Sequence, residues 1–104
     1  KQRRDTLVNC LASHFPDCTI LGQAAGMHLV VEFHSIEFTT KFIRWLQEER
    51  GVKVYSVDHY SILKGTHLTK IVMGYGSLSP GKIEEGVKRL KEGIKQYVDN
   101  SFLN

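Results

Sequence analysis

The chain has 104 residues, of which 41% are hydrophobic, and a formal net charge of +3. A chain of this length can bury one modest core, so residues 1–104 are predicted to form a single domain. The sequence has no apolar run of about twenty residues and no basic-then-apolar leader, so we predict neither a membrane span nor a secretory signal, and expect a cytoplasmic location. Because charges of both signs alternate along the chain, the net charge does not by itself indicate a nucleic-acid partner.

The first predicted helix covers residues 1–15. Its apolar side chains recur at helical spacing, and Pro16 and Asp17 end the pattern; they are Leu7, Val8, Leu11 and Phe15. No capping residue precedes Lys1, so we expect the chain to start inside or just before a longer helix and to be a fragment of a larger protein.

Two apolar segments follow, at residues 18–21 and 27–33. The small, turn-like residues 22–26 separate them, so the pair is predicted to form a β-hairpin. The continuous run Leu29, Val30 and Val31 indicates that the second strand is covered on both faces for part of its length.

A second helix is predicted over residues 36–50, with Ser35 as its N-cap and Gly51 as its C-cap. Its apolar stripe consists of Phe38, Phe42, Trp45 and Leu46. Valines predict a third strand over residues 52–57, a polar loop spans residues 58–68, and a fourth strand is predicted over residues 69–75.

The last helix is predicted from Pro80 to about Asn100, with proline in the first turn, where its missing N–H costs nothing. Its apolar positions follow three-and-four steps: Ile83, Val87, Leu90, Ile94 and Val98. The order α-β-β-α-β-β-α predicts an α+β, two-layer sandwich, with a mostly antiparallel four-stranded sheet and helices on one face.

No catalytic constellation and no metal site emerge from the remaining polar residues. Ser61 and Lys64 match an S-x-x-K pattern without the companion motifs of penicillin-binding enzymes. The histidines at 28, 34, 59 and 67 lack metal-ligand spacing, and His28 fits a hydrogen-bonded core or interface histidine better than a ligand. Cys10 and Cys18 lack CxxC spacing and are expected to stay reduced.

Four stretches resemble the C-terminal small domain of fold type I pyridoxal-phosphate proteins, the aminotransferase fold. They are Arg-Arg-Asp-Thr-Leu at 3–7 through Leu11, Ala-Ala-Gly-Met-His-Leu-Val-Val at 24–31, Arg-Gly-Val-Lys-Val-Tyr-Ser at 50–56, and Gly-Tyr-Gly-Ser-Leu-Ser-Pro at 74–80 with its helix through Leu90. Within that fold, the Ala-Gly-Met-His strand and the Gly-Tyr-Gly-Ser-Leu-Ser turn look most like the MocR subfamily of GntR transcription regulators. Those proteins join an N-terminal winged-helix DNA-binding domain to an aminotransferase-like domain that binds pyridoxal phosphate.

The resemblance implies that the cofactor's lysine, its phosphate-binding residues and the aspartate paired with its pyridine nitrogen lie upstream of this chain. We therefore expect no cofactor-binding residue within residues 1–104 and pyridoxal 5'-phosphate only in the full-length parent. The expected partners are the parent's large pyridoxal-phosphate-binding domain and a second subunit in a homodimer. DNA would be contacted only through an N-terminal domain outside this chain.

The resemblance also points to two residues on the side of the substrate or effector. Many relatives carry an arginine on the last strand that grips the ligand carboxylate through two hydrogen bonds, and the matching position here is Val72. Lys70 lies two residues earlier and so on the same strand face; it could supply a point charge without the planar fork of arginine. Alternatively, Lys70 reaches into solvent.

The function predicted from the sequence is that of a C-terminal small domain in a pyridoxal-phosphate-dependent, GntR/MocR-type regulator. Such a domain forms one wall of the effector or substrate cleft and is not catalytic alone. One alternative is the small domain of a true aminotransferase, for example one acting on 2-aminoadipate-like substrates. Another is a free-standing α+β interaction module.

Overall fold

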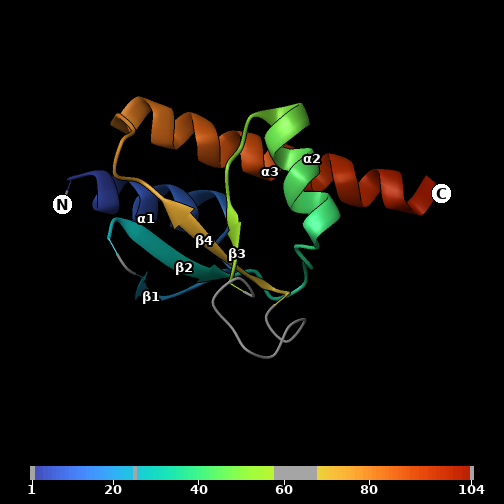
Figure 1. Cartoon of the computed structure of the whole chain (residues 1–104), viewed down its shortest axis with the longest axis horizontal. Coiled ribbons are helices and arrows are strands. Elements are labelled where there is room, and N and C mark those ends of the chain that lie inside the picture. The colour runs from blue at the N-terminus through green and yellow to red at the C-terminus, as the bar shows by residue number, and fades with distance from the viewer. Residues whose placement is uncertain (1, 25, 58–67, 104) are drawn as a thin grey trace.

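The computed structural model describes residues 2–24, 26–57 and 68–103. Three helices and four strands follow one another in the predicted order (Figure 1): α1 (Gln2–His14), β1 (Thr19–Ala24), β2 (His28–Glu32), α2 (Thr40–Arg50), β3 (Tyr55–Ser56), β4 (Lys70–Gly74) and α3 (Pro80–Leu103). Ser61, Lys64, His59 and His67, which the sequence analysis weighed as functional residues, lie outside the described residues.

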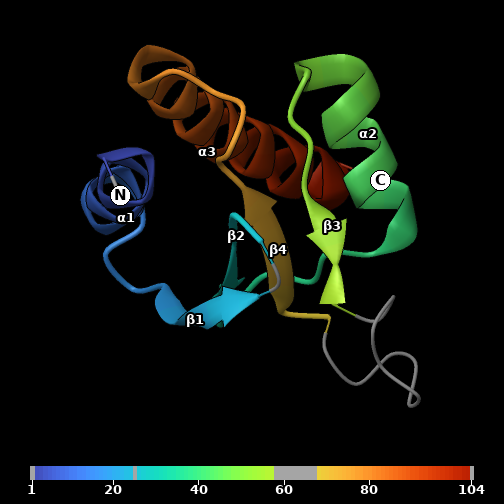
Figure 2. The ribbon, with the colours of Figure 1, turned by 60° about the vertical axis from the view of Figure 1, so that its left-hand side comes forward.

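The four strands form one sheet in the order β1-β2-β4-β3, and each neighbouring pair is antiparallel. The three helices lie on the same side of this sheet (Figure 2). The predicted α+β, two-layer architecture with helices on one face is therefore confirmed. No helix in the described ranges combines the length and apolarity that crossing a membrane requires.

The predicted hairpin is present, but its turn is shorter than expected. β1 continues through Gly22 and Gln23 to Ala24, although these residues were expected to lie in the turn. The register shifts between Ile20 and Gly22, and Gly22 has a φ of 149°, so a bulge absorbs the backbone that the sequence suggested for a loop.

The predicted start of α2 is wrong. Thr39, not Ser35, is the N-cap: its Oγ1 accepts a hydrogen bond from the Phe42 N–H at 3.1 Å. Phe38 precedes the helix, because its N–H donates to the Leu68 carbonyl at 2.8 Å. The residues before Thr39 are thus held beside the chain that enters β4 instead of forming a helical turn.

The predicted end of α2 is confirmed. Gly51 has the left-handed φ of 67°, and the Val52 N–H bonds back across it to the Leu46 carbonyl at 3.0 Å. β3 is shorter than predicted, because Val52 and Val54 are buried without joining the sheet.

One core lies between the helices and the sheet. Six positions of the predicted apolar stripes of α2 and α3 are buried in it: Phe42, Leu46, Ile83, Val87, Leu90 and Ile94. Trp45 is only partly buried, and Val98, the last position of the α3 stripe, is 40% exposed. α3 begins at Pro80 as predicted, and the Ser79 hydroxyl caps it by accepting from the Lys82 N–H. Arg3 fixes the start of α1 to the turn before α3 by donating from Nε to the Leu78 carbonyl at 2.8 Å.

Candidate functional site

The two faces of the sheet differ in what covers them. Leu29, Val31, Ile71 and Met73 point into the core beneath the helices. Because side chains alternate along a strand, their neighbours on β2 and β4 point to the opposite, helix-free face. That face carries His28, Val30, Glu32, Lys70 and Val72.

Lys70 and Val72, the two residues predicted for the ligand side, lie together on the helix-free face. Val72 is only 4% exposed and is not part of the helix-side core. Lys70 is half-buried and stands directly opposite Glu32 on β2. Glu32 in turn accepts a hydrogen bond from Thr69 Oγ1 at 2.9 Å. Opposite charges on facing residues stabilise a strand pair, so Glu32 and Lys70 support the pairing of β2 with β4 at this position.

His28 and Tyr55 occupy the other end of the same face. A β carbon on Gly74 would lie 3.2 Å from both Cδ2 and Nε2 of His28, so the imidazole rests against the bare backbone of Gly74. The ring meets Tyr55 edge-on at a centroid distance of 6.4 Å. Gly74 is the residue that permits this contact across three strands, because a larger side chain would occupy the space of the imidazole.

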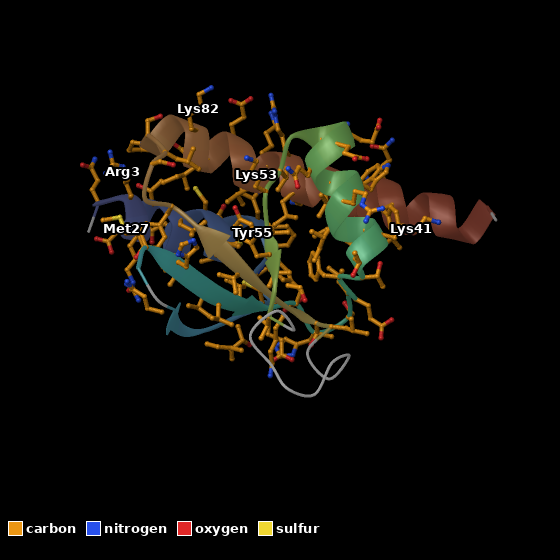
Figure 3. The ribbon with its side chains drawn as sticks, viewed as in Figure 1. Arg3, Met27, Lys41, Lys53, Tyr55 and Lys82 are labelled. Carbon is orange, nitrogen blue, oxygen red and sulfur yellow. The ribbon has the colours of Figure 1, made fainter. Side chains whose placement is uncertain are left out.

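A groove of about 540 Å³ opens beside these residues. It lies where the chain before β3 parts from the end of β4, with the first turns of α3 along its upper side. Its apolar floor comes from α1, β4, α3 and the segment before β3: Leu7, Met73, Ile83, Val87 and Val52. Figure 3 labels four further lining residues, which come from the turn before β2, from the start of β3 and the segment that leads into it, and from α3: Met27, Lys53, Tyr55 and Lys82.

The charges lining the groove are mostly positive. The lining contains three basic side chains, those of Lys53, Lys82 and Arg89, and one acidic side chain, that of Glu85. Arg89 pairs with Glu85 one helical turn away. Its guanidinium also lies close to the left-handed Gly51 at the end of α2, where a β carbon would come within 3.2 Å of an Arg89 terminal nitrogen. A cation there is favoured by the α2 dipole, so Arg89 has a structural role while the two lysines extend into solvent.

Neither cysteine is an activated nucleophile. Both thiols are free, and burial raises the pKa of each; the nearby Glu84 carboxylate raises the pKa of Cys10 further. A raised pKa keeps a thiol protonated at neutral pH, and the thiolate is the reactive form.

A Schiff-base lysine needs a desolvated pocket that lowers its pKa, and no charged side chain in the described part of the chain is buried. The described residues therefore do not fit a cofactor lysine site. Within the same ranges, no group of three His, Cys, Asp or Glu side chains is placed to share a metal ion. His34 instead shares a hydrogen bond of 2.7 Å between Nε2 and Thr19 Oγ1.

The groove was not foreseen from the sequence, and neither was the part that Lys53, Tyr55 and Lys82 play in lining it. The available signal was Gly74, a glycine inside a strand, which commonly marks a close approach of another group. Whether Gly74 faces a neighbouring strand or a groove depends on where β3 stops pairing with β4. That position is set by the path of the chain leaving α2, which the local sequence does not indicate.

Comparison with solved structures identifies aminotransferases as similar folds. An archaeal alanine:glyoxylate aminotransferase matches with a TM-score of 0.78 and 22% identity over 91% of this chain and 23% of its own. A multiple substrate aminotransferase from Thermococcus profundus matches with a TM-score of 0.77 and 20% identity over 95% of this chain and 24% of its own. A kynurenine aminotransferase from Pyrococcus horikoshii, solved with PMP, its substrate and its product, matches with a TM-score of 0.76 and 22% identity over 92% and 24%.

The chain therefore has the fold of one part of these aminotransferases and spans about a quarter of their length. No protein-family model and no curated protein sequence matches it.

Proposed function

We propose that this chain is the C-terminal small domain of a larger pyridoxal-phosphate-dependent protein, in which it forms one wall of the ligand cleft. The observation that carries the proposal is the fold match: more than nine-tenths of the chain superposes on aminotransferases at TM-scores of 0.76 to 0.78, yet it accounts for only 23% to 24% of their length. A large domain of the same parent would hold the cofactor and pack against this one. The parent acts as a homodimer in the cytoplasm.

The helix-free face would look into the cleft, because the helices already cover the other face. Val72, at the position where many relatives place an arginine, offers no charge and no hydrogen bond. Lys70 is the one cation among the β2 and β4 side chains on that face. It would attract an anionic ligand as a point charge without the paired hydrogen bonds of a guanidinium. Such a site suits an effector that is held without being positioned for transamination.

A GntR/MocR-type transcription regulator is the parent that fits this ligand handling best. Support comes from the resemblance of residues 25–28 and 74–79 to that subfamily and from valine at position 72. DNA binding would belong to a winged-helix domain elsewhere in the parent. This chain would contribute ligand-dependent closure over the effector, the movement that small domains make in cleft enzymes.

A true aminotransferase is the second candidate. It is favoured by the solved structures of similar fold, which are described as alanine:glyoxylate, multiple substrate and kynurenine aminotransferases. In that case another residue of the parent would have to bind the substrate carboxylate in place of the missing arginine.

The two candidates differ in the full-length protein. The upstream reading frame would encode a winged helix in a regulator and only a large domain in an enzyme. The purified parent should retard its own promoter DNA in a gel and should convert no amino acid and 2-oxo acid pair at a rate above the cofactor alone. Turnover of such a pair without DNA binding would show that the parent is an aminotransferase and not a regulator.

A further inference from the structure

Among the residues that the structure describes, the pairing of β3 with β4 stops before the end of β4. The Tyr75 N–H donates to the Met27 carbonyl, and the Phe33 N–H donates to the Thr69 carbonyl, which fixes the hydrogen-bonded pairs between β2 and β4. In an antiparallel pair these alternate with pairs whose backbone groups point outward. Gly74 lies opposite His28 in one of the outward pairs, so its N–H and C=O point toward the β3 side.

β3 does not reach Gly74. Its pairing with β4 consists of Tyr55 with Val72 and Ser56 with Ile71 in the described residues. Continuing that register would place Lys53 opposite Gly74, but Lys53 belongs to the segment that turns away toward α2. Both residues line the groove, so within the described residues the groove occupies the place of this strand contact and borders the backbone of Gly74.

Apolar side chains border this space and are themselves poorly covered. Met27 is 53% exposed, Tyr55 44% and Leu78 38%, and all three line the groove. Together with an open strand edge, they form the surface that binds an extended peptide by strand addition: the backbone edge supplies hydrogen bonds and the apolar positions receive alternate side chains. The two solvated lysines, Lys53 and Lys82, would select an acidic segment.

We propose that the groove between Lys53 and Gly74 binds an extended, acidic peptide segment of a partner chain, which pairs with the free edge of β4 at Gly74. The segment places its apolar side chains among Met27, Tyr55 and Leu78 and its carboxylates beside Lys53 and Lys82. This docking surface adjoins the cleft wall formed by Lys70 and Val72, because Tyr55 faces Val72 across the β3–β4 pair, but it requires neither the cofactor nor Lys70.

The test titrates the isotope-labelled chain with a capped hexapeptide of alternating valine and glutamate, observed by amide NMR. Saturable shifts should centre on Gly74, Gly76, Lys53 and Tyr55. Two further peptides separate the contributions: one with glutamine for glutamate, and one methylated on the backbone nitrogens that would face β4. The methylated peptide should bind about fivefold more weakly, as expected for the loss of the hydrogen bond that the Gly74 carbonyl would accept. Equal binding of the methylated peptide would overturn strand addition.

Charge selection is tested with variants of the chain. Lys53→Glu should weaken binding of the glutamate peptide by about fivefold and leave the glutamine peptide unaffected. Lys41→Glu, on the far side of the molecule on α2 (Figure 3), should leave both unchanged. Equal binding of the glutamate and glutamine peptides to the unmodified chain would show that the groove does not select an acidic segment. Shifts at Gly74 that follow protein concentration and ignore added peptide would show that the edge pairs with a second copy, which would also overturn the proposal.

Discussion

Gly93 on α3 and Leu46 on α2 touch so closely that a β carbon on Gly93 would stand 2.8 Å from Leu46 Cδ2. Leu46 is fully buried, and Trp45 and Arg50 close the space on either side. The absence of a side chain at position 93 is therefore what lets the two helices pack at this distance.

Gly93→Ala should destabilise the domain although alanine is the better helix former. Overpacking a filled core costs about 1–3 kcal/mol, which outweighs a propensity gain of about 1 kcal/mol. Gly86→Ala in the same helix is the matched control, since its β carbon would meet nothing within 4 Å. That variant should gain about 0.5–1 kcal/mol. Urea unfolding of both variants checks the opposite signs, and two gains would show that the helices are not in contact at Gly93.

The N-cap of α2 distinguishes the observed helix start from the one expected from the sequence. Thr39→Ala removes the hydroxyl that accepts from the Phe42 N–H and should cost about 1 kcal/mol in the free energy of unfolding. Ser35→Ala should change it by less than about 0.5 kcal/mol, because Ser35 is exposed and caps nothing in the described residues. Denaturant melts of the two variants measure the difference. A larger loss of stability from Ser35→Ala would show that the helix begins after Ser35, as expected from the sequence.

The phase of α3 is tested by neighbouring residues. Leu90 is completely buried, so Leu90→Ala should cost roughly 2–5 kcal/mol, enough to unfold much of a marginally stable domain. Lys91 is exposed, and Lys91→Ala should change stability little. Equal losses of stability in denaturant melts would show that the side of α3 assigned to the core is wrong.

Much of the fold could be predicted from local patterns. The apolar stripe of α3 has a single helical phase, and Gly51 is a strong stop signal, so both were predicted correctly. The start of α2 was predicted wrongly, because Ser35 and Thr39 are equally good N-caps and Phe38 fits the apolar stripe of the helix. The deciding contact, from the Phe38 N–H to the Leu68 carbonyl, spans thirty residues and leaves no trace in the local sequence.

The candidate site was predictable only in part. The spacing of two between Lys70 and Val72 places them on one strand face, and the sheet confirms that they share it. The groove could not be predicted, because alternating Val52 and Val54 resemble a paired strand. The structure buries them against the helices instead, and the pairing begins only at Tyr55.

Lys70 gives a direct test of the ligand side in the full-length parent. If its ammonium contacts an anionic effector, Lys70→Ala should weaken effector binding by about 1–3 kcal/mol. Lys95→Ala is the control, since Lys95 is an exposed residue of α3 on the helix side of the sheet. Calorimetry with candidate amino acids measures both. Unchanged affinity of the Lys70 variant for every ligand that binds would remove this residue from the cleft.

We propose that this chain forms one wall of a cofactor site whose lysine lies elsewhere in the parent. The most direct measurement is to add pyridoxal phosphate to the isolated chain and to the full-length parent, reduce each with borohydride, and map the labelled peptide by mass spectrometry. We predict one stoichiometric label in the parent, on a lysine outside residues 1–104, and no saturable label in the isolated chain. A saturable, stoichiometric label on a single lysine of this chain would contradict the account.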